Sequence, residues 1–301
     1  MKKRILAILL PALLAANICS CSSGPRGRIE RALEYTDTTE SKSETKAGTP
    51  WEEYDAATKM CYYLNEDGMS YSVCPMGLPD VVKELVFPAE YRGLPVTEIR
   101  AYISEVSIET IIIPEGIKVI DGSFDCCFDI KNIYIPASAI YIGESAFNSY
   151  PTMGYPSFIK SNVIENIVVA EGNPYYYVEG NCLIERSSKK IILGCNSSVI
   201  PDDGSVKIIG ESAFANCKSI ETIVLPESII ELEYGAFENC EKLKQVYITS
   251  SALKDKKVIN FDAETAFGYK GGFIVYVPDA ESLEIYSKLY APYTSFEIGN
   301  P

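Results

Sequence analysis

A pattern of apolar and polar residues returns about every 23 residues along much of the chain. The segments Ile208–Cys217 (IIGESAFANC) and Glu231–Cys240 (ELEYGAFENC) share the ending A-F-x-N-C, and Phe214 and Phe237 are 23 residues apart. A second phrase has apolar residues at I-x-x-I-x-I spacing, as in IETIIIP. Four copies of this phrase begin at Ile108, Ile130, Ile220 and Leu243. Such a fixed period indicates a chain built from one repeated structural unit.

Each repeat predicts a short strand, a stop and a tight turn. Residues Ile223–Leu225 alternate in the manner of a strand, and the following proline lacks the N–H that a sheet needs. A second extended piece, Ile229–Leu232, leads into a turn that carries Ala-Phe. We therefore expect a leucine-rich-repeat solenoid over residues 82–272, mostly β with short helical turns. Its predicted buried repeat core comprises Phe124, Phe147, Phe214, Phe237, Cys127, Cys217, Cys240, Ile223 and Leu225.

The two ends of the solenoid have a different pattern. Residues 51–81 predict an N-terminal β-hairpin entry unit with a two-residue type I′ turn at Asp67-Gly68. That register places Cys61 opposite Cys74 in a non-hydrogen-bonded pair, where Cα atoms are close enough for a disulfide. Residues 273–301 predict a strand followed by a short helix, which would close the exposed end of the core.

Two departures from the period predict insertions, near residues 150–160 and 173–195. The second predicts a hairpin over Tyr175–Leu193, in which Cys182 would oppose Cys195 in a second candidate disulfide. Both insertions are rich in aromatic residues, which are favoured at recognition surfaces. The candidate ligand-binding residues are Tyr150, Tyr155, Phe158, Tyr175, Tyr176 and Tyr177. The alternative is that these rings only cover the solenoid where the repeat is interrupted.

The first 20 residues predict a bacterial lipoprotein signal peptide. Lys2, Lys3 and Arg4 precede an apolar stretch that is short for a membrane span. The sequence Ile18-Cys19-Ser20-Cys21 resembles a lipobox, with Cys21 as the lipidated residue; the alternative is an ordinary secretory signal cut near Ser20. Residues 21–50 are rich in Ser, Thr, Glu and Lys and predict a flexible spacer.

Charge and residue types exclude several classes of function. The chain has a formal net charge of −14 and no basic stripe, so we expect no nucleic-acid partner. It has no histidine, which removes His-based nucleophile systems and His metal ligands. No C-x-x-C pair is present, so we expect no metal site, and no motif implies a cofactor. A pair of carboxylates remains as a means of cleaving glycans.

The repeats resemble those of the BspA-type leucine-rich-repeat family of bacterial cell-surface proteins. The residues that carry the resemblance are Leu225-Pro226 to Cys240, Ile200-Pro201 to Cys217, Tyr91–Ile99, Gly172–Tyr176, and Tyr276-Val277-Pro278 with Tyr286. The resemblance implies an envelope-attached binding protein associated with adhesion, and it supplies no catalytic residue.

The sequence therefore favours a non-enzymatic, lipid-anchored binding or adhesion module of the bacterial cell envelope. Its expected partner is a host or bacterial surface protein or glycan, bound through the repeat face and the aromatic insertions. The expected location is the outer membrane. Because no acidic patch follows Cys21 before Glu30, display at the cell surface and a Gram-positive membrane anchor are both left open. The first alternative is a periplasmic or envelope structural lipoprotein, and a carboxylate-based glycan-active enzyme comes third.

Overall fold

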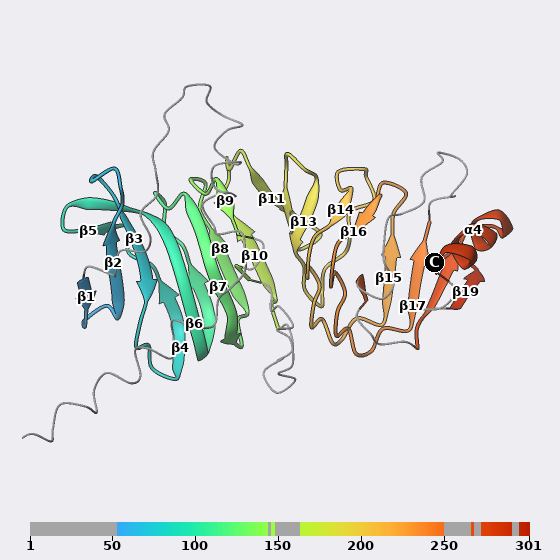
Figure 1. The fold of residues 1–301 in the computed structure, drawn as a ribbon, viewed down its shortest axis with the longest axis horizontal. Helices are drawn as coiled ribbons and strands as arrows, with labels where there is room; N and C mark the ends of the chain where they lie inside the picture. The colour runs from blue at the N-terminus through green and yellow to red at the C-terminus, as the bar shows by residue number, and fades with distance from the viewer. Residues whose placement is uncertain (1–52, 144–145, 148–162, 250–265, 268–271, 291–294) are drawn as a thin grey trace, which may run out of the picture. The chain divides into compact units, whose positions relative to one another are not determined.

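The computed structural model describes residues 53–143, 146–147, 163–249, 266–267, 272–290 and 295–301. All of them belong to one compact unit, residues 48–301, and Figure 1 shows its strands following one another from β1 toward β19, with β5 beside β1 and β2. The unit is a β-solenoid, as the repeat period predicted.

One set of parallel strands comes from the I-x-x-I-x-I phrases, and we call it the first strand row. It comprises β4 (Val81–Val86), the end of β6 (Leu94–Ile112), β8 (Asn132–Ile135), β10 (Asn166–Val169), β15 (Thr222–Leu225), β17 (Gln245–Ile248), β18 (Ile274–Val277) and β19 (Ser295–Ile298). Its pairing runs from β4 to β10 and resumes from β15 to β19. Equivalent residues of successive repeats are aligned, for example Ile223 with Val246.

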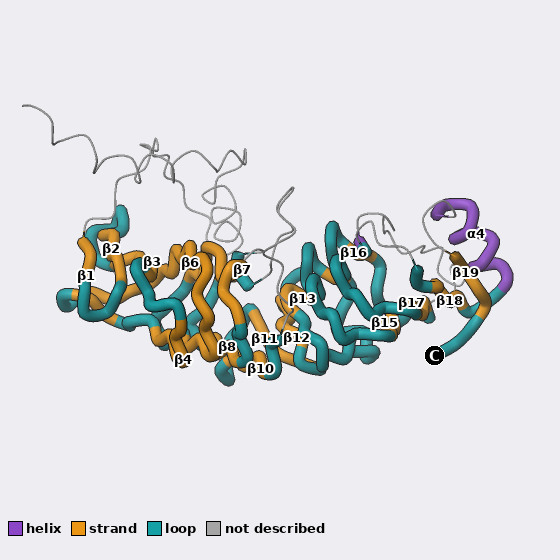
Figure 2. The backbone as a smooth tube through the Cα atoms, turned by 90° about the horizontal axis from the view of Figure 1, so that it is seen from below, coloured by secondary structure: helices purple, strands orange, loops and turns teal. Residues whose placement is uncertain are grey.

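The second strand row comes from the extended piece that precedes the turn of each repeat. It comprises β3 (Tyr71–Pro75), the start of β6, β7 (Val119–Phe128), β9 (Tyr141–Ile142), β13 (Lys190–Leu193), β14 (Ile208–Ile209) and β16 (Glu231–Leu232). The remaining strands are β1 (Glu53–Asp55), β2 (Met60–Leu64), β5 (Glu90–Tyr91), β11 (Tyr176–Glu179) and β12 (Cys182–Glu185). Figure 2 shows the strands joined by turns, with helix α4 (Ala280–Tyr290) after β18.

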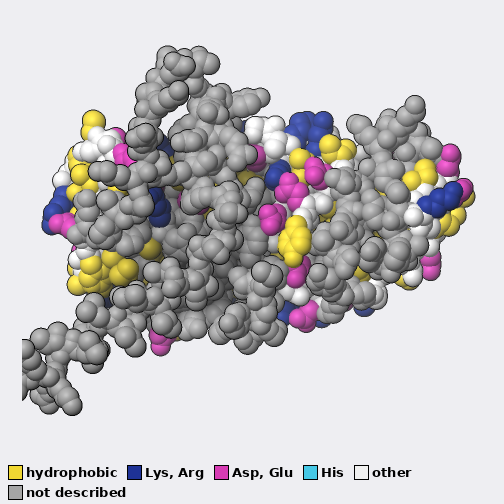
Figure 3. All heavy atoms as spheres, in the orientation of Figure 1, with side chains coloured by type: hydrophobic (Ala, Val, Ile, Leu, Met, Phe, Trp, Pro, Cys, Tyr) yellow, Lys and Arg dark blue, Asp and Glu magenta, His cyan; other side chains and the backbone are white. Residues whose placement is uncertain are grey.

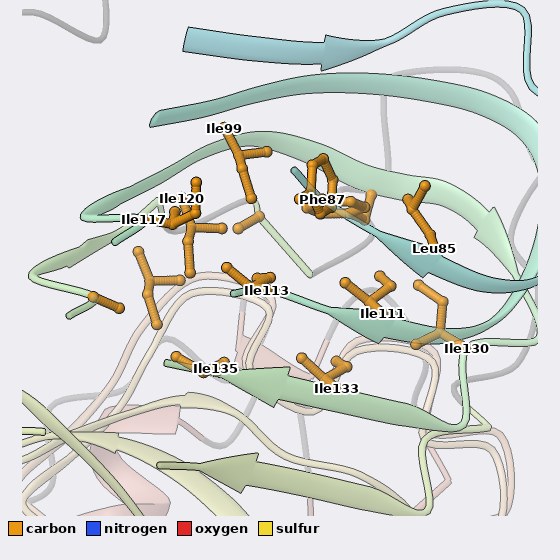
Figure 4. Close-up of a cluster of buried hydrophobic side chains, with 14 of the residues drawn as sticks. Leu85, Phe87, Ile99, Ile111, Ile113, Ile117, Ile120, Ile130, Ile133 and Ile135 are labelled. Carbon is orange, nitrogen blue, oxygen red and sulfur yellow. The ribbon is translucent and has the colours of Figure 1, made fainter. Parts of the chain in front are cut away.

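The interior between the strand rows is filled by isoleucine and phenylalanine. In the phrase that begins at Ile108, the side chains of Ile108, Ile111 and Ile113 are buried. Figure 4 shows inward side chains from β4, β6 and β8 meeting in a common interior. Phenylalanine rings of successive repeats stack: Phe214 on Phe237 at 5.1 Å, and Phe237 on Phe267 at 5.4 Å between ring centroids. The 23-residue period places Phe237 over Phe214, and Phe267 takes the next place in the stack although it comes 30 residues after Phe237.

The hairpin β11–β12–β13 divides this interior into two cores. Leu183 and Leu193 pack in the first core, which the residues upstream of the hairpin form. Ile184 and Ile191 lie on the opposite face of the same strands and pack in the second core. Leu183 and Ile184 alternate as neighbours on a strand, and a bulge in β13 between Ile191 and Leu193 turns these two side chains to different faces as well. One sheet that is apolar on both faces can thus cover the ends of two cores. The hairpin therefore acts as a partition within the solenoid.

The first strand row is interrupted at the same place, and a side chain covers the edge of β10. The Asn181 Oδ1 atom accepts a hydrogen bond from the Ile167 backbone N–H at 3.2 Å. Its Nδ2 atom donates to the Glu165 carbonyl oxygen at 2.8 Å. The amide of Asn181 thus satisfies backbone groups that the next strand would otherwise pair.

The entry hairpin has the predicted register but a different turn. Cys61 lies opposite Cys74, as the predicted register requires. The backbone N–H of Gly68 donates to the Asn65 carbonyl, so the turn spans Asn65 to Gly68. A type I′ turn at Asp67-Gly68 would need a positive φ at Asp67, and Asp67 does not have one. The Asn65 N–H bonds to the Ser70 carbonyl, and hydrogen-bonded pairs recur at every second residue from there. The cysteines therefore occupy a hydrogen-bonded pair, where Cα atoms are farther apart, instead of the non-hydrogen-bonded pair that we predicted.

A strand and a helix close the C-terminal end. The Asp279 Oδ1 atom accepts a hydrogen bond from the Ser282 N–H at 2.7 Å, which caps the start of α4. Tyr286 of this helix is buried in the second core and packs against Phe296 of β19. The structure thus adds a final strand to the strand and helix that we expected.

Candidate binding face

The first strand row presents its outward side chains in three parallel lines. In each I-x-x-I-x-I phrase the isoleucine positions face the core, and the three positions between them face solvent. Parallel pairing without register shifts aligns these positions from strand to strand. The outward surface is therefore as regular as the core.

The line nearest the proline is apolar from β4 to β18, and we call it the apolar row; in β19 the aligned residue is Glu297. Val86, Ile112, Tyr134 and Val168 are aligned across β4, β6, β8 and β10. Val224, Tyr247 and Tyr276 are aligned across β15, β17 and β18, and Val199 has the same sequence position two residues before a proline. Five members are between 37% and 69% exposed, namely Val86, Tyr134, Val168, Val199 and Val224. A single exposed valine or tyrosine is explained by the preference of these residues for strands. A continuous line of exposed apolar side chains across several strands instead marks a contact surface.

The middle line is polar and largely bonded to itself, except in β18, where Ile274 is aligned with Gln245. The Asn166 Nδ2 atom donates to Asn132 Oδ1 at 2.8 Å, and Asn132 Nδ2 donates to Thr110 Oγ1 at 3.2 Å. In the second half, Thr222 Oγ1 donates to Gln245 Oε1 at 3.3 Å. These side chains are partnered within the face, which lowers the cost of covering them.

The third line consists of paired charges. Lys131 Nζ lies 2.9 Å from Glu109 Oε1, and Lys244 Nζ lies 2.9 Å from Glu221 Oε2. The hydrogen bond to Glu109 raises the pKa of Lys131, and the same bond lowers the pKa of Glu109. All four groups are strongly exposed, so each pair contributes little to stability. Its effect is to leave this side of the face close to neutral.

The opposite side of the apolar row is acidic. Three residues after the apolar-row position, five repeats have a carboxylate and none has a lysine or arginine. We call these residues the acidic border: Glu115, Glu171, Asp202, Glu227 and Asp279. The first four are exposed. The face is thus asymmetric, with an apolar centre, one neutral side and one anionic side.

Tyrosine rings within the apolar row face one another. The rings of Tyr247 and Tyr276 are stacked, with centroids 4.7 Å apart and planes within 15°. Because these faces are in mutual contact, the rings present edges and hydroxyls outward. The two ring faces that touch each other are therefore not open for a sugar ring to stack on.

The hairpin aromatics do not form the site that the sequence predicted. Tyr176 is 2% exposed, and its hydroxyl oxygen accepts a hydrogen bond from the Ile142 N–H at 3.0 Å. Burial raises its pKa well above the ordinary value. Tyr175 packs against the first core and Tyr177 against the second, both half-buried. The partition role of the hairpin accounts for all three, and Tyr176 is placed in the core because it joins the hairpin to the preceding repeat. Tyr150, Tyr155 and Phe158 lie outside the described residues.

The predicted core residues lie largely inside. Phe124, Phe214, Phe237, Cys217, Cys240, Ile223 and Leu225 are buried. Phe147 and Cys127 are half-buried against the first core. Their burial leaves none of the first seven available for binding.

The cysteines of the hairpin do not oppose each other. On the β13 side Glu185 lies opposite Lys190 and Leu183 opposite Leu193, a register that does not bring Cys182 opposite Cys195. On the β11 side Cys182 pairs with Glu179. The predicted register was wrong because the turn is one residue earlier and a bulge follows Leu183. Burial raises the pKa of the Cys182 thiol to about 12. Such a thiol behaves as a small apolar side chain.

Within the described part of the chain, no three acidic, cysteine or histidine side chains are grouped so as to hold a metal ion. None of the helices described there has the length and apolar character that a bilayer crossing demands. Among the side chains that are coloured in Figure 3, acidic and basic groups are interspersed.

Sequence reasoning did not single out the apolar row, although its signal is present. The residue two positions before the proline is apolar in phrase after phrase, while the other outward positions are polar. This contrast distinguishes an exposed apolar row from the inward apolar residues that every strand needs.

A stack of parallel coils with inward isoleucines, outward-facing strands and a Phe ladder defines a leucine-rich-repeat solenoid. The family described as BspA type Leucine rich repeat region matches residues 92–170 and 188–261 in 6 copies, and the chain belongs to it. Repeats of this family typically serve protein binding or adhesion, and no catalytic function is indicated.

Three solved structures are similar to this chain. A leucine-rich repeat protein of T. pallidum is 22% identical, with 65% of this chain and 72% of that chain covered and a TM-score of 0.33. One from Eubacterium ventriosum is 14% identical, with 66% and 72% covered and a TM-score of 0.35. A leucine rich cell surface protein of Faecalibacterium prausnitzii is 13% identical, with 85% and 97% covered and a TM-score of 0.25. No curated protein matches the chain.

Proposed function

We propose that this protein is a non-enzymatic binding module of the bacterial cell envelope that holds a protein partner on its apolar row. The observation that carries the proposal is the alignment of exposed apolar side chains across successive strands. These side chains lie outside the core, so the fold does not require them. Covering an apolar surface of this kind is favourable at about 25 cal/mol per Å².

A protein is favoured over a glycan as the partner. The ring faces of Tyr247 and Tyr276 are in contact with each other, which removes a stacking platform. The middle line of amides is already bonded to itself, whereas sugar recognition relies on open polar groups. An apolar line with satisfied polar neighbours instead matches the centre and rim of a protein interface.

The proposal includes attachment to the membrane through lipidated Cys21, with residues 22–50 as the spacer. The signal-like first 20 residues and the lipobox-like Ile18–Cys21 support it. Two or three acyl chains would suffice for stable anchoring.

Binding of the full-length chain to paired arrays of matrix proteins, envelope proteins and glycans tests the proposal. Two matched pairs of variants locate the site: Tyr134→Lys against Tyr234→Lys, and Val168→Glu against Val163→Glu. All four residues are exposed, but only Tyr134 and Val168 belong to the apolar row. We expect saturable protein binding that only the row variants remove. Glycan binding that survives both row variants would refute the proposal.

A further inference from the structure

We propose that the occupant of the apolar row is a cationic amphipathic α-helix of the partner protein, which lies along the row and across the strands. This inference rests on the proposed function, because it names the kind of partner that the same face holds. Three observations carry it: the spacing of the row, its width and the charges beside it.

The spacing of the row suits a helix better than a strand. Parallel strands are about 4.8 Å apart, and the Tyr247 and Tyr276 ring centroids are 4.7 Å apart. A helix that lies across the strands offers side chains from one face about every 5.4 Å. An extended chain in the same direction offers them only about every 6.7 Å. Over the four aligned positions from Val86 to Val168, a helix of about ten residues remains in step.

The apolar row is one side chain wide. The next outward line contains Thr110, Asn132 and Asn166, which are bonded to one another. A partner therefore needs a narrow apolar stripe with polar residues on both sides. A helix with leucines at i, i+3, i+4 and i+7 has such a stripe.

The charges on the two sides differ, and they specify the sign of the partner. On one side Lys131 pairs with Glu109, and Lys244 pairs with Glu221. On the other side the acidic border contains no basic residue at the equivalent positions. Glu171 and Glu227 are exposed members of it. Lysines and arginines along one flank of a helix would complement this border, and an acidic helix would be repelled.

Labelled model peptides test this inference by fluorescence anisotropy at about 0.15 M salt, where remote charges are screened. The first peptide has 14 residues of Leu and Lys, with leucine at i, i+3, i+4 and i+7. The second has the same composition with Leu and Lys alternating, which favours a strand. The third is the helical peptide with Glu in place of Lys. We expect saturable binding of the first peptide to the full-length chain, and at least about tenfold weaker binding of the other two.

Variants distinguish the acidic border from the acidity of the whole protein. We expect Glu171→Lys with Glu227→Lys to weaken binding of the first peptide about tenfold, and Tyr134→Lys to do the same. Glu179→Lys and Tyr234→Lys change exposed residues outside the face and should leave binding unchanged. Comparable weakening by the control variants would show attraction by net charge alone, and unchanged binding to the row and border variants would place the peptide elsewhere; either result would overturn the inference.

Other outcomes separate this inference from the proposed function. Tighter binding of the alternating peptide would overturn the helix and retain the row. Self-association of the chain that Tyr134→Lys abolishes would assign the row to a second copy and also overturn the helix. No binding of any peptide, with array binding still sensitive to Tyr134→Lys, would overturn only the cationic helix. Insensitivity of both assays to Tyr134→Lys would overturn both.

Discussion

Replacing Phe237 by alanine should destabilise the second core strongly. The ring is 1% exposed and lies between Phe214 at 5.1 Å and Phe267 at 5.4 Å. Truncation of a buried phenylalanine costs about 3–5 kcal/mol, which includes the cavity that remains. Two stacking partners are lost at once, so we place Phe237→Ala at the upper end, about 4–5 kcal/mol. An exposed change such as Tyr234→Ala should cost less than about 0.5 kcal/mol.

The loss should be confined to one side of the hairpin partition. In a solenoid each repeat is stabilised by its neighbours, and here β11–β13 separate two cores. Amide hydrogen exchange of Phe237→Ala should therefore show faster exchange in β14–β18 and near-normal protection in β2–β8. Phe124→Ala is the matched variant, because Phe124 is 1% exposed and packs between Phe87 and Phe147 in the first core. It should give the reverse pattern.

Urea unfolding followed by circular dichroism measures the magnitude, and exchange measures its location. A cost below about 1 kcal/mol for Phe237→Ala would refute the ladder as a source of stability. Equal loss of protection on both sides of the hairpin in both variants would refute the partition.

Three further changes have defined outcomes. Cys21→Ser should abolish acylation as measured by mass spectrometry of the membrane fraction, whereas Cys19→Ser should retain it; the reverse would move the lipidation site. Because burial raises the pKa of Cys182 from 9.0 to about 12, the folded protein holds this proton more tightly, so stability should fall as pH rises from about 9 to about 12. The urea midpoint of Cys182→Ala should fall less over that range, and an identical fall would exclude this thiol as a cause. Asn181→Ala removes the amide that covers the β10 edge and should cost about 1–3 kcal/mol in urea unfolding, with faster exchange at Ile167; unchanged exchange there would contradict the capping role.

The repeats were predictable from the sequence because period and burial are linked. Residues such as Ile223 and Leu225 face the core since strand side chains alternate, and a 23-residue period brings Phe214 and Phe237 into one stack. Short-range geometry was less predictable. In the hairpin at Asp67 the Gly68 N–H bonds to the Asn65 carbonyl, which changes the pattern of hydrogen bonds along the two strands. The cysteine pair therefore occupies a hydrogen-bonded position instead of a non-hydrogen-bonded one.

The role of the hairpin insertion could not be deduced from composition. Three consecutive tyrosines suggest a recognition surface, but the strands around them are apolar on both faces, as a partition requires. Ile184 and Leu183 face different cores, and this information lies in the pairing of β12 with β13. The apolar row can be seen in the sequence, because one outward position of the phrase is apolar and its outward neighbours are polar. Only the pairing of the strands shows that these residues form a continuous line across paired strands.

Site-specific photo-cross-linking in intact cells tests the central claim most directly. A benzophenone amino acid is placed at Tyr134 in the apolar row and, as the control, at Tyr234, which is 51% exposed outside it. We expect one discrete protein adduct from position 134 and none from position 234. Adducts from position 234 alone, or the same adducts from both positions, would contradict a binding face on the first strand row.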